Sequence, residues 1–189
     1  MRVFDKMHQQ MPTLKLYVVG MKPCNEKLFT FAELSSFDNV IFTGQVSSND
    51  LKNMLNRASL MLITSYQEGL GIVGLEAMLH GTPVIATDCG GPRDYVIDDV
   101  TGYLVAINDD QAMAEKALGV LKSPELHHKL SINARRLIEE QFSTAKIYKQ
   151  FKDGLSTTYP LLQKWFNDAD AERMALHGYE RAKPLQEAQ

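Results

Sequence analysis

Two glutamates, Glu68 and Glu76, stand on either side of a glycine-rich corner and are the side chains best suited to chemistry in this sequence. Gly69 and Gly71 carry no Cβ, so the backbone can turn sharply there and approach a ligand closely. The apolar segment that follows is typical of a helix, whose first turn offers unpaired N–H groups and a positive dipole end that suit a phosphate. Carboxylates accept hydrogen bonds from hydroxyl groups, which sugars carry in abundance. The two carboxylates can thus flank one ligand from different directions.

The residues around this corner predict a strand, a tight loop and the N-terminus of a helix. The apolar run 60–63 ends in the polar residues Thr64 and Ser65, immediately before the corner. Other short apolar runs, bounded by glycine, proline or polar residues, have the same strand character. The strands expected in chain order are 14–19, 39–44, 60–64, 84–86 and 103–105.

Strands that alternate with helices predict an α/β fold, with a Rossmann-like parallel sheet flanked by helices. Ligands of such sheets bind outside the carboxyl ends of the strands. Gly20, Gln45, Glu68 and Gly90 each follow an expected strand at that end. The topology therefore places the site at the same edge as the chemistry of the corner.

The expected helices complete this pattern. Residues 1–10 predict a helix with one buried face, and Ser47 with Asp50 is a capping pattern for a helix at 50–57. Gly81 is the expected C-terminal cap of the helix after the corner. Further helices are expected through Phe29, Phe31 and Leu34, after Ser123 and after Ser143, and through the apolar stripe Leu161, Leu162, Trp165 and Phe166. We expect a Rossmann-like domain at 1–142 and a helical C-terminal segment at 143–189.

The corner belongs to an ordered set of motifs that extends over about forty residues. In order, these motifs are EGLG at 68–71, EAM at 76–78, GTPVIAT at 81–87, DCGGPRD at 88–94 and TGYLV at 101–105. The set resembles the Glu-seven-Glu signature of retaining family-four glycosyltransferases, also called group-1 glycosyltransferases. The resemblance implies the C-terminal, nucleotide-sugar-binding half of the GT-B fold.

The resemblance also implies a role for each part of the site. Glu76 corresponds to the residue that binds the ribose hydroxyls of a nucleotide-sugar donor, and Glu68 to the one near the donor sugar; these two are the catalytic candidates. The loop Gln45-Val46 lies against the nucleotide base, mainly through its backbone. The remaining donor-binding candidates are Gly20, Gly69, Leu70, Gly71, Ile72, Val73, Gly90 and Gly91.

The resemblance further implies a retaining reaction of the front-face kind, in which the leaving phosphate assists the incoming hydroxyl. The protein must then stabilise the charge that grows on the departing diphosphate. The helix N-terminus at 70–73 can do part of this without a metal. No cofactor is expected beside the nucleotide-diphosphate sugar, which is the donor substrate.

Each of these residues also has an ordinary structural interpretation. Glu76 could be a solvated helix carboxylate, although its apolar neighbours favour a partner, and Glu68 could be a solvent-facing loop residue. Arg93 is interpreted as a surface or loop-stabilising residue, and His80 as a cap that complements the helix dipole. Cys89 is interpreted as a small residue tolerated in a loop.

Composition and charge exclude several other classes. Hydrophobic residues make up 44% and charged residues 23% of the 189 residues, as in an ordinary globular protein. The net charge of -3 and the lack of a basic run disfavour a nucleic-acid binder. The neighbours His127 and His128 diverge on a helix, so no metal site is expected, and no GxGxxG fingerprint follows Gly20. With two distant cysteines and no signal or spanning segment, a cytoplasmic protein is expected.

The resemblance starts inside a helix, at 3–11, and family members have more in front of it. There they carry the first strand of the domain, a loop with an Arg and a Lys that grip the diphosphate, and a separate acceptor-binding domain. We therefore expect the chain alone to transfer no sugar and to need that domain, in cis or in trans. Any peripheral membrane contact is expected through that domain, and self-association through the apolar stripe or an open sheet edge. The alternative function is a non-catalytic nucleotide-sugar-binding or regulatory module.

Overall fold

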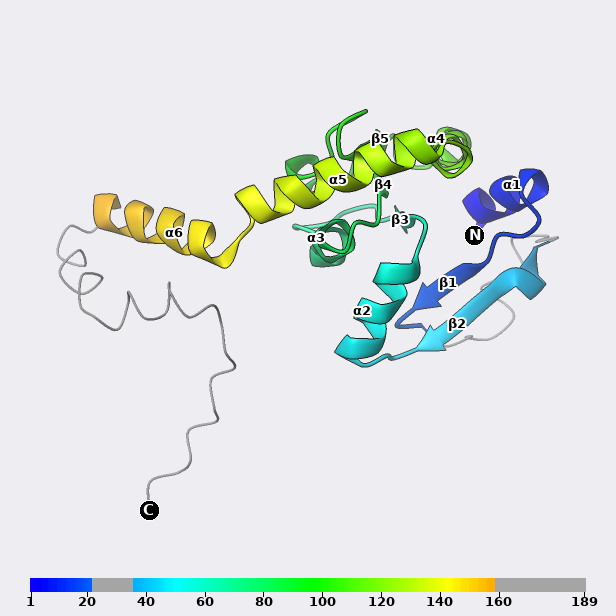
Figure 1. Cartoon of the computed structure of the whole chain (residues 1–189), viewed down its shortest axis with the longest axis horizontal. Helices are drawn as coiled ribbons and strands as arrows, with labels where there is room; N and C mark the ends of the chain where they lie inside the picture. The colour runs from blue at the N-terminus through cyan, green and yellow to red at the C-terminus, as the bar shows by residue number, and fades with distance from the viewer. Residues whose placement is uncertain (22–35, 159–189) are drawn as a thin grey trace, which may run out of the picture. The chain divides into compact units, whose positions relative to one another are not determined.

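The structure is a computed structural model that describes residues 1–21 and 36–158 (Figure 1). The chain divides into two compact units, Met1–Leu137 and Ile138–Gln189. All described strands belong to the first unit. The site expected from the sequence therefore lies within one unit.

Parallel strands and helices alternate through the first unit, which confirms the predicted α/β fold. Each strand lies within two residues of its expected bounds. The strands are β1 (Leu16–Val19), β2 (Val40–Gly44), β3 (Met61–Ile63), β4 (Val84–Thr87) and β5 (Gly102–Val105). The helices are α1 (Arg2–Gln10), α2 (Ser48–Arg57), α3 (Ile72–Leu79), α4 (Asp110–Lys122) and α5 (Pro124–Gln141), with short 3-10 turns η2 (Phe37–Asn39) and η3 (Gly91–Asp94).

The strands form two parallel sheets instead of the single sheet expected from the sequence. One sheet has the order β1-β2 and the other the order β3-β4-β5. The doubly wound fold has the strand order 3-2-1-4-5-6. Strands 3 and 2 of that order correspond to β2 and β1, and strands 4, 5 and 6 correspond to β3, β4 and β5. No described strand corresponds to strand 1, whose position is between β1 and β3. Because β1 and β3 are not neighbours in this order, no ladder can join them directly.

Burial of the strands agrees with this topology. All four residues of β4 are buried, as expected for a parallel strand covered on both faces. In β1 the side chains alternate between half-buried and exposed, although all four are apolar or aromatic. Tyr17 is 52% exposed and Val19 is 41% exposed. The sheet that contains β1 is therefore less completely covered than the sheet that contains β4.

The main core of the first unit lies between α1, α4 and the second sheet (Figure 1). The buried face of α1 contributes Val3 and Met7, which meet Met113 and Leu118 of α4 in this cluster. Such burial stabilises by about 1.5–3 kcal/mol for each large apolar side chain. Ile85, Tyr103, Val105, Ala114, Ala117, Val120 and Leu130 complete the cluster.

Local sequence explains where the helices begin and end. The Ser47 side chain accepts a hydrogen bond from the Asp50 N–H, which confirms the predicted cap of α2. Asp109 caps α4 in the same way, through the Ala112 N–H at 2.9 Å. Gly81 adopts φ +78 after α3 and donates its N–H to the Met78 carbonyl, as expected of a C-terminal glycine cap.

In the second unit the structure describes the end of α5 and helix α6 (Thr144–Thr158). The Ser143 hydroxyl accepts a hydrogen bond from the Lys146 N–H at 3.4 Å, so α6 begins where Ser143 predicts. The predicted helix through Phe29, Phe31 and Leu34 and the stripe from Leu161 to Phe166 lie outside the described residues. Of the helices that are described, none is both long and apolar enough to cross a bilayer.

Candidate functional site

The corner between β3 and α3 has the geometry that its glycines predict. Gly71 is the N-terminal cap of α3 and adopts the left-handed conformation, with φ 77 and ψ 56. This conformation favours glycine, and a Cβ at Gly71 would also lie 2.7 Å from the Tyr95 hydroxyl oxygen. The N–H groups of Ile72 and Val73 have no intrahelical partner, because they lie in the first turn of the helix. The corner therefore presents backbone donors at the positive end of a helix dipole.

The loops that follow β3 and β4 are joined through their backbones. The Glu68 N–H donates to the Cys89 carbonyl at 3.3 Å, and the Gly91 N–H donates to the Glu68 carbonyl at 2.9 Å. Glu68 and Gly90 form an isolated parallel bridge. A Cβ at Gly91 would lie 2.5 Å from the Gly69 oxygen. The structure thus brings together the predicted site residues of these two loops.

The two glutamates have different surroundings. Glu68 is half-buried, and its carboxylate accepts a hydrogen bond of 3.4 Å from the Ser65 hydroxyl. Glu76 is exposed on α3, and its carboxylate has no partner in the part of the chain that the structure describes. The apolar neighbours of Glu76 therefore do not bury it. Its carboxylate is available to a ligand that reaches this side of α3.

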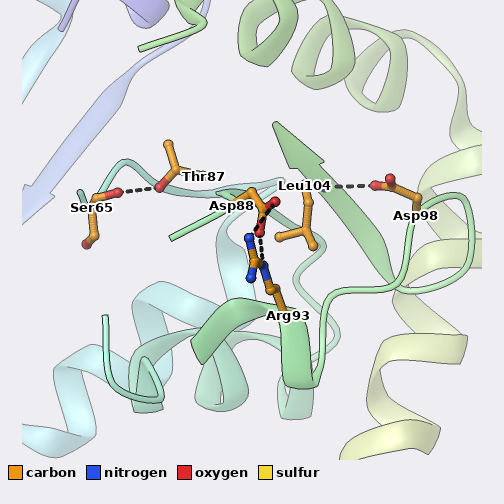
Figure 2. Close-up of polar contacts among 6 residues, drawn as sticks. All are labelled: Ser65, Thr87, Asp88, Arg93, Asp98 and Leu104. Atoms are coloured by element: carbon orange, nitrogen blue, oxygen red, sulfur yellow. Dashed lines mark hydrogen bonds and ion pairs between the residues drawn. The ribbon is translucent and has the colours of Figure 1, made fainter. Parts of the chain in front are cut away.

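Polar contacts fix the loop after β4, as Figure 2 shows. Thr87 donates to the Ser65 carbonyl at 2.5 Å, which joins the ends of β4 and β3. Arg93 forms a two-point ion pair with Asp88 across the glycine turn, with Nη2–Oδ2 at 3.1 Å and a shorter Nε–Oδ1 contact. The hydrogen bond from Arg93 lowers the pKa of Asp88, and the same contact raises the pKa of Arg93. These contacts agree with the interpretation of Arg93 as a loop-stabilising residue.

The tips of β1 and β2 form a second group of site candidates. The Gly20 N–H donates to the Gly44 carbonyl at 2.9 Å, and the Gly44 N–H donates to the Met21 carbonyl at 3.0 Å. Gln45 is exposed and Val46 is half-buried. This group follows strands of the first sheet, whereas Glu68, Gly90 and Gly91 lie in the loops that follow β3 and β4 of the second sheet. The expected site residues therefore lie at the ends of strands in both sheets.

Sequence reasoning missed Tyr95, whose hydroxyl donates to the Gly71 carbonyl at 3.1 Å. Tyr95 is fully buried, and a tyrosine beside a valine in the sequence is indistinguishable from an ordinary core aromatic. The glycine pair Gly71 and Gly74, spaced three residues apart, was the available signal for a bulky side chain packed against the start of α3.

His80 lies at the C-terminal end of α3, where its Nδ1 is 2.8 Å from the Asn56 side-chain oxygen. This position agrees with its interpretation as a cap residue. Within residues 1–21 and 36–158, no group of three or more His, Cys, Asp or Glu side chains is placed to hold a metal ion.

Comparison with known proteins identifies relatives of this arrangement. The sequence model of the family "Glycosyl transferases group 1" matches residues 1–137. N-acetyl-alpha-D-glucosaminyl L-malate synthase of Bacillus anthracis is 36% identical over 115 residues, which cover 61% of this chain and 30% of that protein. Alpha-1,3/1,6-mannosyltransferase ALG2 of Eremothecium gossypii is 33% identical over 150 residues, which cover 72% of this chain and 29% of that protein.

Solved structures show the same fold. A crystal structure of an S. aureus TarM mutant in complex with fondaparinux, alpha-GlcNAc-glycerol and UDP matches with a TM-score of 0.71 at 27% identity, over 80% of this chain and 31% of that chain. Sucrose-phosphate synthase from Thermosynechococcus elongatus matches with a TM-score of 0.73 at 28% identity, over 85% of this chain and 42% of that chain.

The chain spans about a third of the length of the curated relatives that it matches. Within that span, the family match covers the corner, both site loops and all described strands. The structural relatives are GT-B glycosyltransferases, whose fold the parallel sheets and flanking helices share. The chain belongs to the group-1 glycosyltransferases.

Proposed function

We propose that this chain is the donor-binding part of a retaining glycosyltransferase. It binds a nucleotide-diphosphate sugar, and the complete enzyme transfers the sugar to an acceptor hydroxyl. The observation that carries the proposal is the corner at Gly71, where the first N–H groups of α3 have no intrahelical partner and lie between the two glutamates of one family motif in the sequence. TarM, a relative of similar fold, has been solved with UDP.

The diphosphate lies at the start of α3. The N–H groups of Ile72 and Val73 point out of the helix end, where the dipole favours negative charge. As the sugar departs, charge grows on the diphosphate, and preorganised N–H donors stabilise that charge. Each such donor contributes up to about 3–4 kcal/mol in a water-excluded site. The leaving phosphate itself assists the incoming hydroxyl, which accounts for retention of configuration.

The two glutamates bind different ends of the donor. Glu76 accepts hydrogen bonds from the ribose hydroxyls, and its exposed carboxylate, which has no partner among residues 1–21 and 36–158, suits this role. Glu68 lies closer to the loop after β4 and accepts from hydroxyls of the transferred sugar. The loop Gln45-Val46 contacts the base, mainly through its backbone.

We also propose how the whole protein is organised. We place the donor-binding domain at 1–142 and a helical segment at 143–189. The acceptor-binding domain acts with this chain in cis or in trans, and the enzyme works in the cytoplasm.

Alanine variants of the two glutamates test these assignments. Glu76→Ala is expected to weaken UDP binding by about 1–3 kcal/mol, because hydrogen bonds to a charged acceptor are lost. Glu68→Ala is expected to weaken binding of a UDP-sugar more than binding of UDP. Isothermal titration calorimetry with both ligands measures the two effects.

The matched control is Glu115→Ala, which removes an exposed helix carboxylate on α4. It is expected to leave both affinities unchanged. Equal losses of UDP and UDP-sugar affinity in Glu68→Ala would contradict the role assigned to Glu68. Unchanged UDP affinity in Glu76→Ala would contradict the ribose contact.

A further inference from the structure

Tyr95 is the largest side chain that is fully buried in the described part of the chain. It follows the 3-10 turn η3 directly after the site loop, and its ring extends beneath the start of α3. A buried tyrosine hydroxyl must find a hydrogen-bond partner, because an unsatisfied one costs about 1–3 kcal/mol. The partner that Tyr95 uses lies in the candidate site.

That partner is the Gly71 carbonyl, which receives two hydrogen bonds. The Tyr95 hydroxyl donates to it at 3.1 Å, and the Gly74 N–H donates to it at 2.8 Å. Gly71 is the N-terminal cap of α3, so its peptide group sets the direction in which the first helical turn begins. The hydroxyl of Tyr95, the residue that follows η3, therefore holds the residue that orients the Ile72 and Val73 N–H groups.

Two glycines make this contact sterically possible. A Cβ at Gly71 would lie 2.7 Å from the Tyr95 hydroxyl oxygen and 3.1 Å from Glu68 Cγ. A Cβ at Gly74 would overlap the same hydroxyl and lie 2.9 Å from Tyr95 Cε2. Gly71 is therefore the position at which the start of α3 packs against both the Glu68 side chain and Tyr95.

The Tyr95 hydroxyl also keeps its proton at neutral pH. Burial raises the pKa of Tyr95 to about 12, and the negative charge of Glu68 adds to this effect. The hydroxyl therefore remains a donor to the Gly71 carbonyl at neutral pH.

We propose that Tyr95 is a positioning residue for the diphosphate, holding Gly71 so that the first N–H groups of α3 and the Glu68 carboxylate keep their binding geometry. This inference rests on the proposed function, because it assumes that a nucleoside diphosphate binds at the start of α3. Tyr95 is fully buried, so its effect passes through Gly71.

Tyr95→Phe removes only the hydroxyl, and Tyr103→Phe is its matched control. Tyr103 is also buried, its hydroxyl donates to Asp99 at 2.7 Å, and its pKa is likewise raised to about 12. It lies on β5, and neither its hydroxyl nor Asp99 is part of the corner. Each variant therefore removes a hydrogen-bonded hydroxyl from a buried tyrosine, and only one of them loses the contact to Gly71.

Two readouts separate positioning from simple stabilisation. In Tyr95→Phe, affinity for UDP is expected to fall about 3- to 10-fold, the range that one hydrogen bond represents, whereas affinity for uridine stays unchanged. Hydrogen exchange of the Gly74 amide is expected to accelerate, because its acceptor is no longer held. Tyr103→Phe is expected to change neither quantity, whatever its effect on thermal stability.

Wild-type UDP affinity in Tyr95→Phe, or equal losses for UDP and uridine, would overturn the proposal. If the wild-type chain binds no nucleoside diphosphate, the proposed function fails, and the exchange rate of Gly74 alone shows whether Tyr95 holds the helix start. If Tyr95→Phe does not fold, the wild-type chain labelled with 13C in tyrosine serves instead. UDP should then shift the Cζ resonance of Tyr95 and leave that of Tyr103 in place, and an unmoved Tyr95 resonance would refute the inference.

Discussion

Gly91→Ala is expected to lower UDP affinity at least about tenfold and to destabilise the first unit by about 1–3 kcal/mol, the usual cost of overpacking. The new Cβ would lie 2.5 Å from the Gly69 oxygen and 2.5 Å from the Leu70 Cα, both of which are backbone atoms. Backbone atoms cannot rotate away as a side chain can, so the loops that follow β3 and β4 must move apart. The hydrogen bond from the Gly91 N–H to the Glu68 carbonyl, now 2.9 Å, would lengthen with them.

Calorimetry of UDP binding, together with thermal unfolding, measures this effect. Gly119→Ala is the control, because a Cβ there meets no heavy atom within 4 Å. Gly119 lies within α4, where alanine is expected to raise stability by about 0.5–1 kcal/mol and to leave UDP affinity unchanged. A Gly91→Ala chain that binds UDP like the wild type would show that the two loops do not need this close approach.

The chain alone is expected to bind the nucleotide-sugar donor but to transfer no sugar. The chain spans only about a third of the length of its curated relatives, and no described strand fills the sheet position between β1 and β3. Binding needs the corner and its two loops, whereas transfer also needs an acceptor held in line with the donor. An acceptor misplaced by even an ångström can cost about 100-fold in rate.

Labelled-sugar transfer to a panel of acceptors, with and without an added acceptor-binding domain from a group-1 glycosyltransferase, tests this expectation. Turnover by the isolated chain well above the uncatalysed rate would show that one domain suffices. Donor binding without transfer in the completed protein would favour the alternative, a non-catalytic binding or regulatory module.

Local rules predicted most of the elements from the sequence. Ser47 capped α2 and Gly81 ended α3 as expected, because both depend on neighbours within one helical turn. The alternation of apolar runs with helical periodicity likewise predicted parallel strands. The motif around Glu68 also placed the corner correctly, since glycine positions restrict the backbone directly.

Features that depend on contacts distant in sequence could not be predicted. The separation into two sheets depends on which strands are neighbours in space, and periodicity reports only the faces of each strand. The sequence left two interpretations of Glu76 open, because apolar neighbours alone do not show which face of α3 is buried: Ala77 and Met78 are fully buried, whereas Ile72 and Val73 are exposed like Glu76 itself. Tyr95 looked like any core aromatic, and only its 3.1 Å hydrogen bond to the Gly71 carbonyl distinguishes it.

A 15N NMR titration of the isolated chain with UDP, GDP and ADP tests the proposed donor site directly. Amide resonances at 44–46, 68–73 and 90–91 are expected to shift, because these residues surround the proposed nucleotide position at the carboxyl ends of the strands. The size of the shifts with each nucleotide would rank the bases. Shifts confined to residues 126–140 of α5, with the corner at Gly71 unmoved, would contradict the proposed donor site.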